Sequence, residues 1–372
     1  MKVDGKPRRS IWLETDGWSV GVIDQTRLPH QLATATLTTL DAAAAAITRM
    51  VIRGAPLIGA TAAYGMCLAL RQDTSDDAIA RAYKVLLATR PTAINLKWAL
   101  DEMVAAVRDR PRAERMAAAY ARAAEISAED IAINQAIGRH GLALIEDIAA
   151  RKKPGEPVNI LTHCNAGWLA TVDVGTATAP IYTAHDKGVP VHVWVDETRP
   201  RNQGASLTAW ELGQHGVAHR VIPDNTGGHL MQRGLVDMAI VGADRVARNG
   251  DVCNKIGTYL KALAAHDNAI PFYVGLPSPT IDFTIPDGRD IPIEERDAGE
   301  VATMTGLTAG GRIETIRVVP PGSRVANYGF DVTPARLVTG LITERGVIAA
   351  TPDALAQAFP ERASRVARRA AE

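Results

Sequence analysis

Two residues capable of acid–base or nucleophilic chemistry, Cys164 and Asp244, each stand directly after an apolar run. Cys164 lies in the segment THCN at residues 162–165, which follows the apolar residues 158–161. Structural cysteines usually have apolar neighbours, whereas Cys164 lies between a histidine and an asparagine. The sequence leaves two interpretations open, an inert buried thiol or a reactive thiol at the start of a helix.

Asp244 is predicted to emerge at the lip of an apolar crevice, because residues 240–243 read as the end of a buried strand. Burial raises the pKa of a carboxyl group and keeps it protonated, which suits a proton donor. The alternative is that Asp244 caps a helix or pairs with its neighbour Arg245.

Three basic residues are predicted to lie at the starts of helices, where free backbone N–H groups favour an anion. Arg53 and Arg90 each precede a proline by one to three positions, and Lys255 follows Asn254. A lysine at a helix start opposes the helix dipole, so a bound anion would explain Lys255. Arginines in such places suit a phosphate, although each residue alone is more ordinary as an exposed side chain.

Polar, glycine-bearing loops follow four successive predicted strands and begin at residues 162, 196, 223 and 243. In an open parallel sheet, the carboxyl ends of the strands meet at one edge, and ligands bind there. Any one of these loops is ordinary turn chemistry, but four on the same edge indicate a binding site.

The elements that would position this site fall into two parts. Residues 11–36 indicate short strands, and the following residues predict helices at about 42–50, 56–70, 76–89, 94–109 and 111–150. After the charged, proline-rich residues 152–157, apolar runs at 158–161, 189–195, 219–222, 238–242 and 270–275 read as strands. Helices are predicted between them at 167–187, 204–215, 227–234 and 254–267, and a basic tail at 362–369 is expected to be a helix end.

This alternation predicts an α/β fold with a doubly wound, mostly parallel Rossmann-like sheet, preceded by a mainly helical domain with short strands. We place the N-terminal helical domain at residues 1–153 and the Rossmann-like domain at residues 154–372. A length of 372 residues suits two domains.

Composition and missing motifs exclude several classes of protein. The 41 basic and 41 acidic residues balance, so there is no general attraction for nucleic acid or an anionic membrane. Cys67, Cys164 and Cys253 lack Cys-x-x-Cys spacing, which argues against disulfides and zinc ribbons and favours a reducing cytoplasm. We expect no signal peptide and no membrane span.

Metal and nucleotide sites are also disfavoured. His215 and His219 are separated by a predicted turn at Gly216, so we expect no metal there. The first strand of the predicted sheet is not followed by Gly-x-Gly-x-x-Gly, and neither a Walker A loop nor a Gly-x-Ser-x-Gly elbow occurs.

The chain resembles methylthioribose-1-phosphate isomerases in segments that occur in that family's order and span most of its length. They are RGAPLIG at 53–59, THCNAG at 162–167, ETRP at 197–200 with QG at 203–204, GADR at 242–245, NGD at 249–251 with NKIGT at 254–258, and FDVTP at 330–334. The wider family includes ribose-1,5-bisphosphate isomerases and regulatory subunits of the translation-initiation exchange factor, which share the fold without the chemistry.

The resemblance implies an aldose–ketose isomerase, an intramolecular oxidoreductase that converts 5-methylthioribose 1-phosphate to 5-methylthioribulose 1-phosphate in methionine salvage. It implies that Asp244 is the acid and that Cys164 helps to stabilise the transition state. It places substrate contacts on Arg53, Gly54, Ala55, Arg90, Gln203, Asn254 and Lys255.

The expected chemistry begins at the furanose ring, because a sugar 1-phosphate has no free anomeric hydroxyl. Asp244 would protonate the ring oxygen, and hydrogen would then move from carbon 2 to carbon 1. It would travel as a hydride, or through an enolate with a Cys164 thiolate as base, and the sequence leaves both routes open. Neither route needs a metal or an organic cofactor. The expected partners are the sugar phosphate and a second copy of the chain in a homodimer, without nucleic acid or membrane.

Two alternatives to this function remain at the level of sequence. One is an isomerase of ribose 1,5-bisphosphate or 5-deoxyribose 1-phosphate, and the other is a non-catalytic regulatory subunit. The presence of Cys164 and Asp244 favours an enzyme, and anchors for only one phosphate favour the methylthio substrate. Departures from the family pattern at Ser206, residues 225–228 and residues 328–329 affect crevice loops, where they could change the 5-substituent that is accepted.

Overall fold

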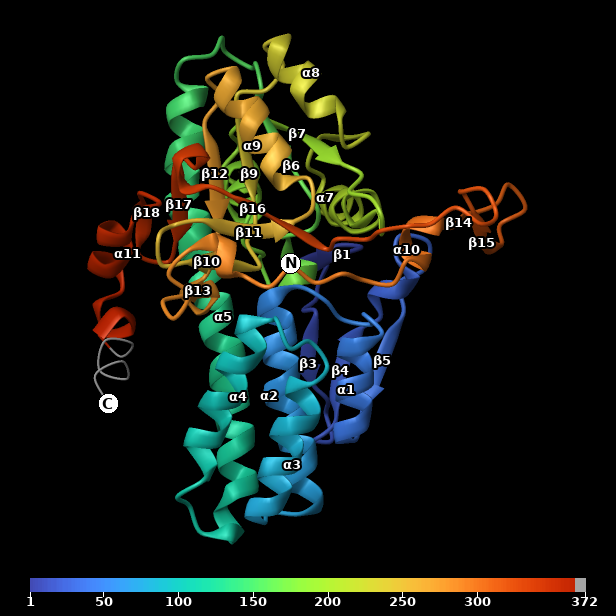
Figure 1. Ribbon diagram of the computed structural model, residues 1–372, viewed down its shortest axis with the longest axis vertical. Coiled ribbons are helices and arrows are strands. Elements are labelled where there is room, and N and C mark those ends of the chain that lie inside the picture. The colour runs from blue at the N-terminus through green and yellow to red at the C-terminus, as the bar shows by residue number, and fades with distance from the viewer. Residues whose placement is uncertain (365–372) are drawn as a thin grey trace.

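The computed structural model describes residues 1–364, with a sheet region standing over a bundle of helices (Figure 1). The chain begins with short strands, as predicted: β1 (Lys2–Val3), β2 (Lys6–Pro7), β3 (Ile11–Leu13), β4 (Val20–Ile23) and β5 (Thr34–Leu37). Strands β3, β4 and β5 form an antiparallel sheet, in which Ile11 pairs with Val22 and Val20 pairs with Leu37. These side chains are buried against the helices that follow, so the small sheet is one wall of the helical region.

Five helices confirm the predicted helical segments: α1 (Leu40–Thr48), α2 (Ala55–Gln72), α3 (Asp76–Leu87), α4 (Ile94–Val107) and α5 (Arg112–Ala149). The hydroxyl of Thr39 accepts a hydrogen bond from the amide of Ala42 at 3.1 Å and starts α1, and Ser75 does the same for α3. Helix α2 lies at the centre, in contact with α1, α3, α4 and α5, so its residues 57–70 are buried on every side.

Helix α5 lies against both parts of the molecule. Its first half packs with α2 through Ala119, Ala123 and Ile126, and its second half packs through Ile137 and Ile145 against the large sheet. A side chain at Gly141 would begin only 2.3 Å from Cγ of Pro180, so this close approach requires glycine. The domain boundary at residues 153 and 154 stays a prediction, because the helix before it contacts both sides.

The second part contains a seven-stranded sheet in the order β18-β17-β12-β9-β6-β7-β8. Its strands are β6 (Val158–Thr162), β7 (Val191–Asp196), β8 (His219–Ile222), β9 (Met238–Val241), β12 (Phe272–Gly275), β17 (Gly340–Thr343) and β18 (Gly346–Ile348). All neighbours are parallel except β17 and β18. The strand order reverses between β6 and β9, which confirms the doubly wound prediction and marks where a ligand crevice opens.

The helices of this second part confirm the predicted segments at 204–215 and 227–234, depart from the prediction near residue 170 and at residues 254–257, and include two that were not predicted. They are α6 (Ala179–Asp186), the π-helical turn η3 (Gly204–Thr208), α7 (Ala209–His215), α8 (Thr226–Gln232), α9 (Thr258–Asp267) and the two unpredicted helices, α10 (Gly299–Ala302) and α11 (Pro352–Ala358). The predicted helix at 167–187 is wrong in its first half, where only η2 (Trp168–Ala170) is helical. Gly167 and Gly175 form an isolated bridge there, and Val174 has a φ of 75°, so the backbone turns instead.

A second sheet, which the sequence reading missed, carries Lys255. Its order is β13 (Ile281–Asp282), β10 (Arg245–Ala247), β11 (Val252–Lys255) and β16 (Phe330–Thr333). The prediction that Asn254 and Lys255 start a helix is wrong, because both pair with β16 and α9 begins only at Thr258. The helix-dipole argument for Lys255 therefore does not apply. Arg90 likewise lies in the α3–α4 connection and does not start α4.

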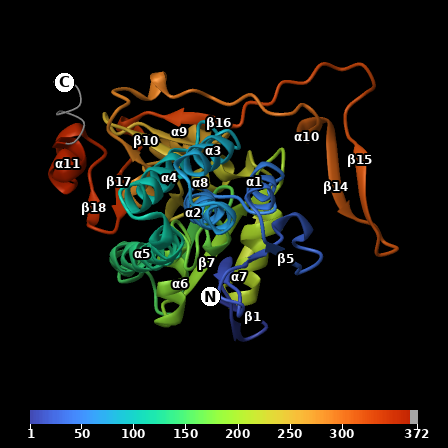
Figure 2. The same cartoon turned by 90° about the horizontal axis from the view of Figure 1, so that it is seen from below.

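A hairpin of β14 (Thr303–Leu307) and β15 (Ile313–Arg317) extends from the side of the molecule (Figures 1 and 2). The remaining short turns are η1 (Gln25–Arg27), η4 (Ser278–Thr280), η5 (Gly288–Asp290) and η6 (Ala335–Leu337). The predicted basic tail at 362–369 lies mostly outside the described residues. Within residues 1–364, no helix is both long and apolar enough to cross a membrane.

Candidate active site

The reversal point of the large sheet holds a pocket that contains Cys164 and Asp244 together. Cys164 follows β6 and Asp244 follows β9, and the N-terminus of α2 faces them from the helical region. All nine residues that the sequence and the resemblance single out line this pocket: Arg53, Gly54, Ala55, Arg90, Cys164, Gln203, Asp244, Asn254 and Lys255. Residues from both parts of the chain therefore meet at one place.

Cys164 is buried and sits in a loop, because β6 ends two residues earlier and no helix starts there. Its φ is 64°, in the left-handed region, and its thiol lies 3.9 Å from Oε1 of Gln203. Burial raises the pKa of the Cys164 thiol, and the positive charges of Arg53 and Lys255 oppose that rise. The thiol is thus kept protonated but lies among cations that would stabilise negative charge on it.

Asp244 connects the two sheets, since it lies between β9 and β10. Its backbone N–H donates to the carbonyl of Cys253 at 2.9 Å. Burial raises the pKa of its carboxyl group, against the charges of Lys255, Arg90 and Arg53. Both alternatives for Asp244 are wrong, because a strand follows it and Arg245 pairs with Asp282 at 3.5 Å.

Arg53 reaches from the start of α2 to the loop after β6. Its two terminal nitrogens donate to the side-chain oxygen and the carbonyl of Asn165. Gly54 is the N-cap of α2 with a φ of 99°, and a side chain on it would begin 2.5 Å from the Ala170 backbone. Glycine is therefore required where α2 meets the loop after β6, and the free amides of α2 point toward the pocket.

Arg90 and Lys255 also line the pocket, and a further cation joins them. Arg90 lies 3.4 Å from Glu294, and Arg296 lies 3.1 Å from the same carboxylate. Lys255 donates to the carbonyl of Gly329 at 2.9 Å, and burial lowers its pKa. Sequence reasoning missed Arg296, because the charged run at 294–297 looks like an exposed turn and contains no periodic signal.

Apolar side chains complete the lining; none was predicted as a site residue, although four of them lie in the segments that carry the resemblance. They are Met50, Pro56, Ile58, Ala166, Ala170, Pro277 and Phe330. Met50 follows α1 and Phe330 begins β16, so they come from opposite ends of the chain. The lining thus combines cations with apolar side chains, and the two kinds touch: Arg296 lies 3.7 Å from Sδ of Met50, and the ammonium of Lys255 lies 4.7 Å from the Phe330 ring centroid.

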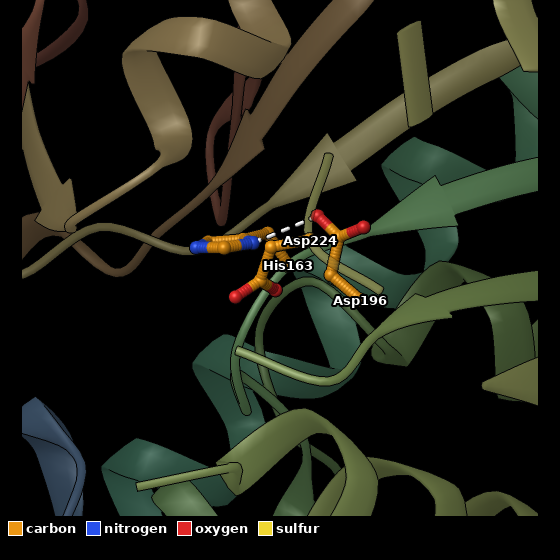
Figure 3. A group of neighbouring side chains, drawn as sticks. All are labelled: His163, Asp196 and Asp224. Carbon is orange, nitrogen blue, oxygen red and sulfur yellow. Dashed lines mark hydrogen bonds and ion pairs between the residues drawn. The ribbon is translucent and has the colours of Figure 1, made fainter. Parts of the chain in front are cut away.

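Beside the pocket, His163, Asp196 and Asp224 lie close enough together to suggest a metal site (Figure 3). His163 Nδ1 lies 2.8 Å from Asp196 Oδ2, and its Nε2 lies 2.8 Å from the carbonyl of Ile256. However, the ammonium group of Lys261 lies 3.2 Å from the same Asp196 oxygen. Lysine already provides the positive charge at this cluster, so its residues do not fit a metal ion.

The fold agrees with the comparisons to known proteins. Residues 51–350 match the Initiation factor 2 subunit family, and the chain belongs to that family. It is 64% identical over 369 residues to a methylthioribose-1-phosphate isomerase of Rhodospirillum centenum, covering 99% of this chain and 98% of that protein. A protein of the same name from Rhodospirillum rubrum is 63% identical over 368 residues, covering 98% and 94%.

Solved structures similar to this chain include both an isomerase and an initiation-factor subunit. A 5-methylthioribose 1-phosphate isomerase from Pyrococcus horikoshii superposes with a TM-score of 0.81 at 38% identity, covering 96% of this chain and 97% of that one. The delta subunit of translation initiation factor eIF-2B from A. fulgidus has a TM-score of 0.75 at 36% identity, covering 97% and 100%. Fold alone therefore does not separate the enzyme from the factor subunit.

Proposed function

We propose that this protein isomerises 5-methylthioribose 1-phosphate to 5-methylthioribulose 1-phosphate, a step of methionine salvage, as an intramolecular oxidoreductase. The observation that carries the proposal is the meeting of Cys164 and Asp244 in one pocket, opposite the N-terminus of α2 and its arginine. A non-catalytic subunit would not need a buried acid and a buried thiol in the same cavity. The high identity to enzymes of this name over nearly the whole chain supports the same conclusion.

In this proposal, cations of the pocket hold the phosphate on carbon 1. Arg53 and Arg90 act from the helical side, together with the backbone amides of Gly54 and Ala55, and Lys255 acts from β11. Gln203 and Asn254 would contact the sugar hydroxyls. A phosphate would replace Asn165 as the partner of Arg53, since charge-assisted bonds to a dianion are stronger than bonds to an amide.

Asp244 would protonate the ring oxygen, which breaks the bond between that oxygen and carbon 1 and leaves positive charge on carbon 1. A hydride then moves from carbon 2 to carbon 1, and the hydroxyl on carbon 2 becomes the carbonyl by losing its proton to Asp244. The carboxyl group is thereby restored, and no electron leaves the substrate. Burial raises the pKa of Asp244, so its protonated form is available for the first step.

The state of Cys164 favours this hydride route over the enolate route. Burial raises the pKa of its thiol, so the thiolate base that an enolate requires is disfavoured. A polarisable, uncharged thiol can instead lie beside the cationic carbon. Substrate deuterated at carbon 2 tests this: the hydride route carries the label to carbon 1 in ordinary water, whereas the enolate route loses it to solvent.

The apolar lining supports a methylthio group on carbon 5 over a second phosphate. Met50, Pro277 and Phe330 offer contacts that suit a thioether. Arg296 is a further cation, but Glu294 at 3.1 Å and Glu300 at 2.8 Å already balance it. A second buried dianion would therefore lack a free partner, which costs several kcal/mol.

The direct test is turnover by the purified protein without any partner. We expect a higher kcat/KM for 5-methylthioribose 1-phosphate than for 5-deoxyribose 1-phosphate or ribose 1,5-bisphosphate, measured side by side. A higher value for the bisphosphate would assign the chain to the other isomerases. Absence of turnover on all three would favour the regulatory subunit.

We also infer that the protein is a homodimer of the cytoplasm, as expected from sequence. Sedimentation equilibrium tests the dimer directly, and a monomer at micromolar concentration would contradict it.

A further inference from the structure

Cys164 is held in an unusual backbone conformation by two threonine hydroxyls. Residues with a side chain rarely adopt a φ near its value of 64°. Its N–H donates to Oγ1 of Thr198 at 2.7 Å, and its carbonyl accepts from Oγ1 of Thr208, also at 2.7 Å. We propose that Thr198 and Thr208 are positioning residues that fix the direction of the Cys164 thiol, a role that rests on the proposed function of that thiol.

Thr198 can act this way because its own position is fixed from two sides. Its hydroxyl donates to the carbonyl of Asp196 at 3.0 Å, so its lone pair is directed toward the amide of Cys164. Its backbone N–H donates to Oδ1 of Asp224 at 2.7 Å, and the other carboxylate oxygen accepts from Arg199. Loops after three adjacent strands, β6, β7 and β8, thus join at Thr198.

Thr208 connects the thiol to the phosphate side of the pocket. Its hydroxyl donates to Cys164 and accepts from Nδ2 of Asn165 at 3.1 Å, and Asn165 in turn binds Arg53. Thr208 ends the π-helical turn η3, a feature often found at functional sites. Gly204 begins that turn, where a side chain would start 1.7 Å from the carbonyl of Asp196, so the loop closes tightly.

Both threonines are buried, so removal of either hydroxyl leaves a polar group of the Cys164 peptide without a partner. The loop is then free to relax toward an ordinary φ, which turns the thiol away from carbon 1. A displacement of about 1 Å at a reacting group can reduce the rate by about 100-fold. Loss of the Thr198 hydroxyl should change substrate binding less than loss of the Thr208 hydroxyl, because only Thr208 is linked to Arg53 through Asn165.

The test compares three variants of the full-length protein. Thr198→Val keeps the branched shape without the hydroxyl, and we expect kcat to fall by about 10- to 100-fold with KM within about threefold. Thr198→Ser keeps the hydroxyl and should restore kcat to within about threefold of wild type. Thr61→Val is the control, because its buried hydroxyl bonds the Leu57 carbonyl at 2.8 Å inside α2, away from Cys164.

A second readout separates this proposal from the proposed function. The rate at which iodoacetamide alkylates Cys164, followed by mass spectrometry of its peptide, should rise in Thr198→Val and return to the wild-type value in Thr198→Ser. This rate needs no substrate, so it decides the positioning role even if wild type does not turn over the sugar phosphate. An unchanged alkylation rate in Thr198→Val, or a loss of kcat that Thr198→Ser does not restore, overturns the proposal. If Thr198→Val does not fold, Thr208→Val decides by alkylation and kcat.

Discussion

The two walls of the pocket differ in how their polar groups are held. On the sheet wall, the backbone of Cys164 is held by the hydroxyls of Thr198 and Thr208, and the N–H of Asp244 donates to the carbonyl of Cys253. On the helical wall, Arg53 and Arg90 are long side chains whose partners, Asn165 and Glu294, are groups that an anion can replace. From this difference we expect the sheet wall, the rigid wall, to carry the chemistry, and the helical wall, the adaptable wall, to bind the phosphate together with Lys255 of β11.

The largest expected effect is that of Asp244→Asn on the rigid wall. The variant keeps the shape but removes the transferable proton, so we expect kcat to fall by about 10² to 10⁴ with KM little changed. Asp237→Asn is a matched control at the other end of β9, where Asp237 bonds Lys152 at 2.7 Å. Steady-state kinetics measure both, and a near wild-type kcat in Asp244→Asn would remove the acid role.

Cys164→Ser should show a smaller loss on the same wall. A hydroxyl is less polarisable than a thiol and ionises less readily, so we expect kcat to fall by about 10- to 100-fold while KM stays within a few fold. A large rise in KM with unchanged kcat would place Cys164 among the binding groups and contradict the division between the walls.

On the adaptable wall, Arg90→Ala should change KM instead of kcat. A charged hydrogen bond contributes about 1.5–3 kcal/mol, so KM should rise about ten- to a hundredfold. Arg289→Ala is the control, because Arg289 is an exposed arginine that pairs only with Asp287 among the described residues. If Arg90→Ala leaves KM unchanged while the fold is intact, Arg90 serves structure through Glu294.

The two walls also differ in how well the sequence predicts them. Cys164 and Asp244 follow apolar strands, and strand order alone brings them together, so they could be found from pattern. The helix argument for Lys255 fails, because a short strand such as β11 has no clear period and Asn-Lys shortly before Gly-Thr looks like a helix start. The resemblance places Lys255 in the site without any helix argument, and Lys255 does line the pocket.

Contacts that depend on distant side chains could not be predicted. Arg296 enters the pocket through Glu294 and Glu300, which lie in an irregular segment that has no strand or helix pattern. Of the threonines around Cys164, Thr208 ends a π-helical turn and Thr198 lies in a loop with a φ of 66°, an angle that its residue type disfavours. Tertiary contacts decided these positions.

The smallest expected effect is on stability, and it concerns Asp130, where the helical region contacts the loop after β6. Asp130 of α5 accepts from the amide of Val172 at 2.8 Å and from Asn134 at 3.1 Å, and so ties the helical region to the loop after β6. Burial raises the pKa of Asp130 from 3.8 to about 7. The folded state therefore holds its proton more tightly than the unfolded state, and this contribution to stability is lost as pH rises through the folded pKa.

Asp130→Asn should flatten that pH dependence, because the amide stays neutral at every pH. A single proton changes the free energy of unfolding by at most about 1.4 kcal/mol per pH unit, so the variant should lose less stability than wild type between about pH 5 and pH 7. Urea unfolding midpoints across this range measure it, with Asp101→Asn as control, because the Asp101 side chain is 43% exposed. Glu211, whose pKa burial also raises to about 7, should leave a residual slope in the variant. If the pH dependence of stability in Asp130→Asn equals that of wild type, Asp130 is ionised in the folded protein. The bond between Asp130 and Val172 would then involve a charged carboxylate, as the helical wall involves charged arginines.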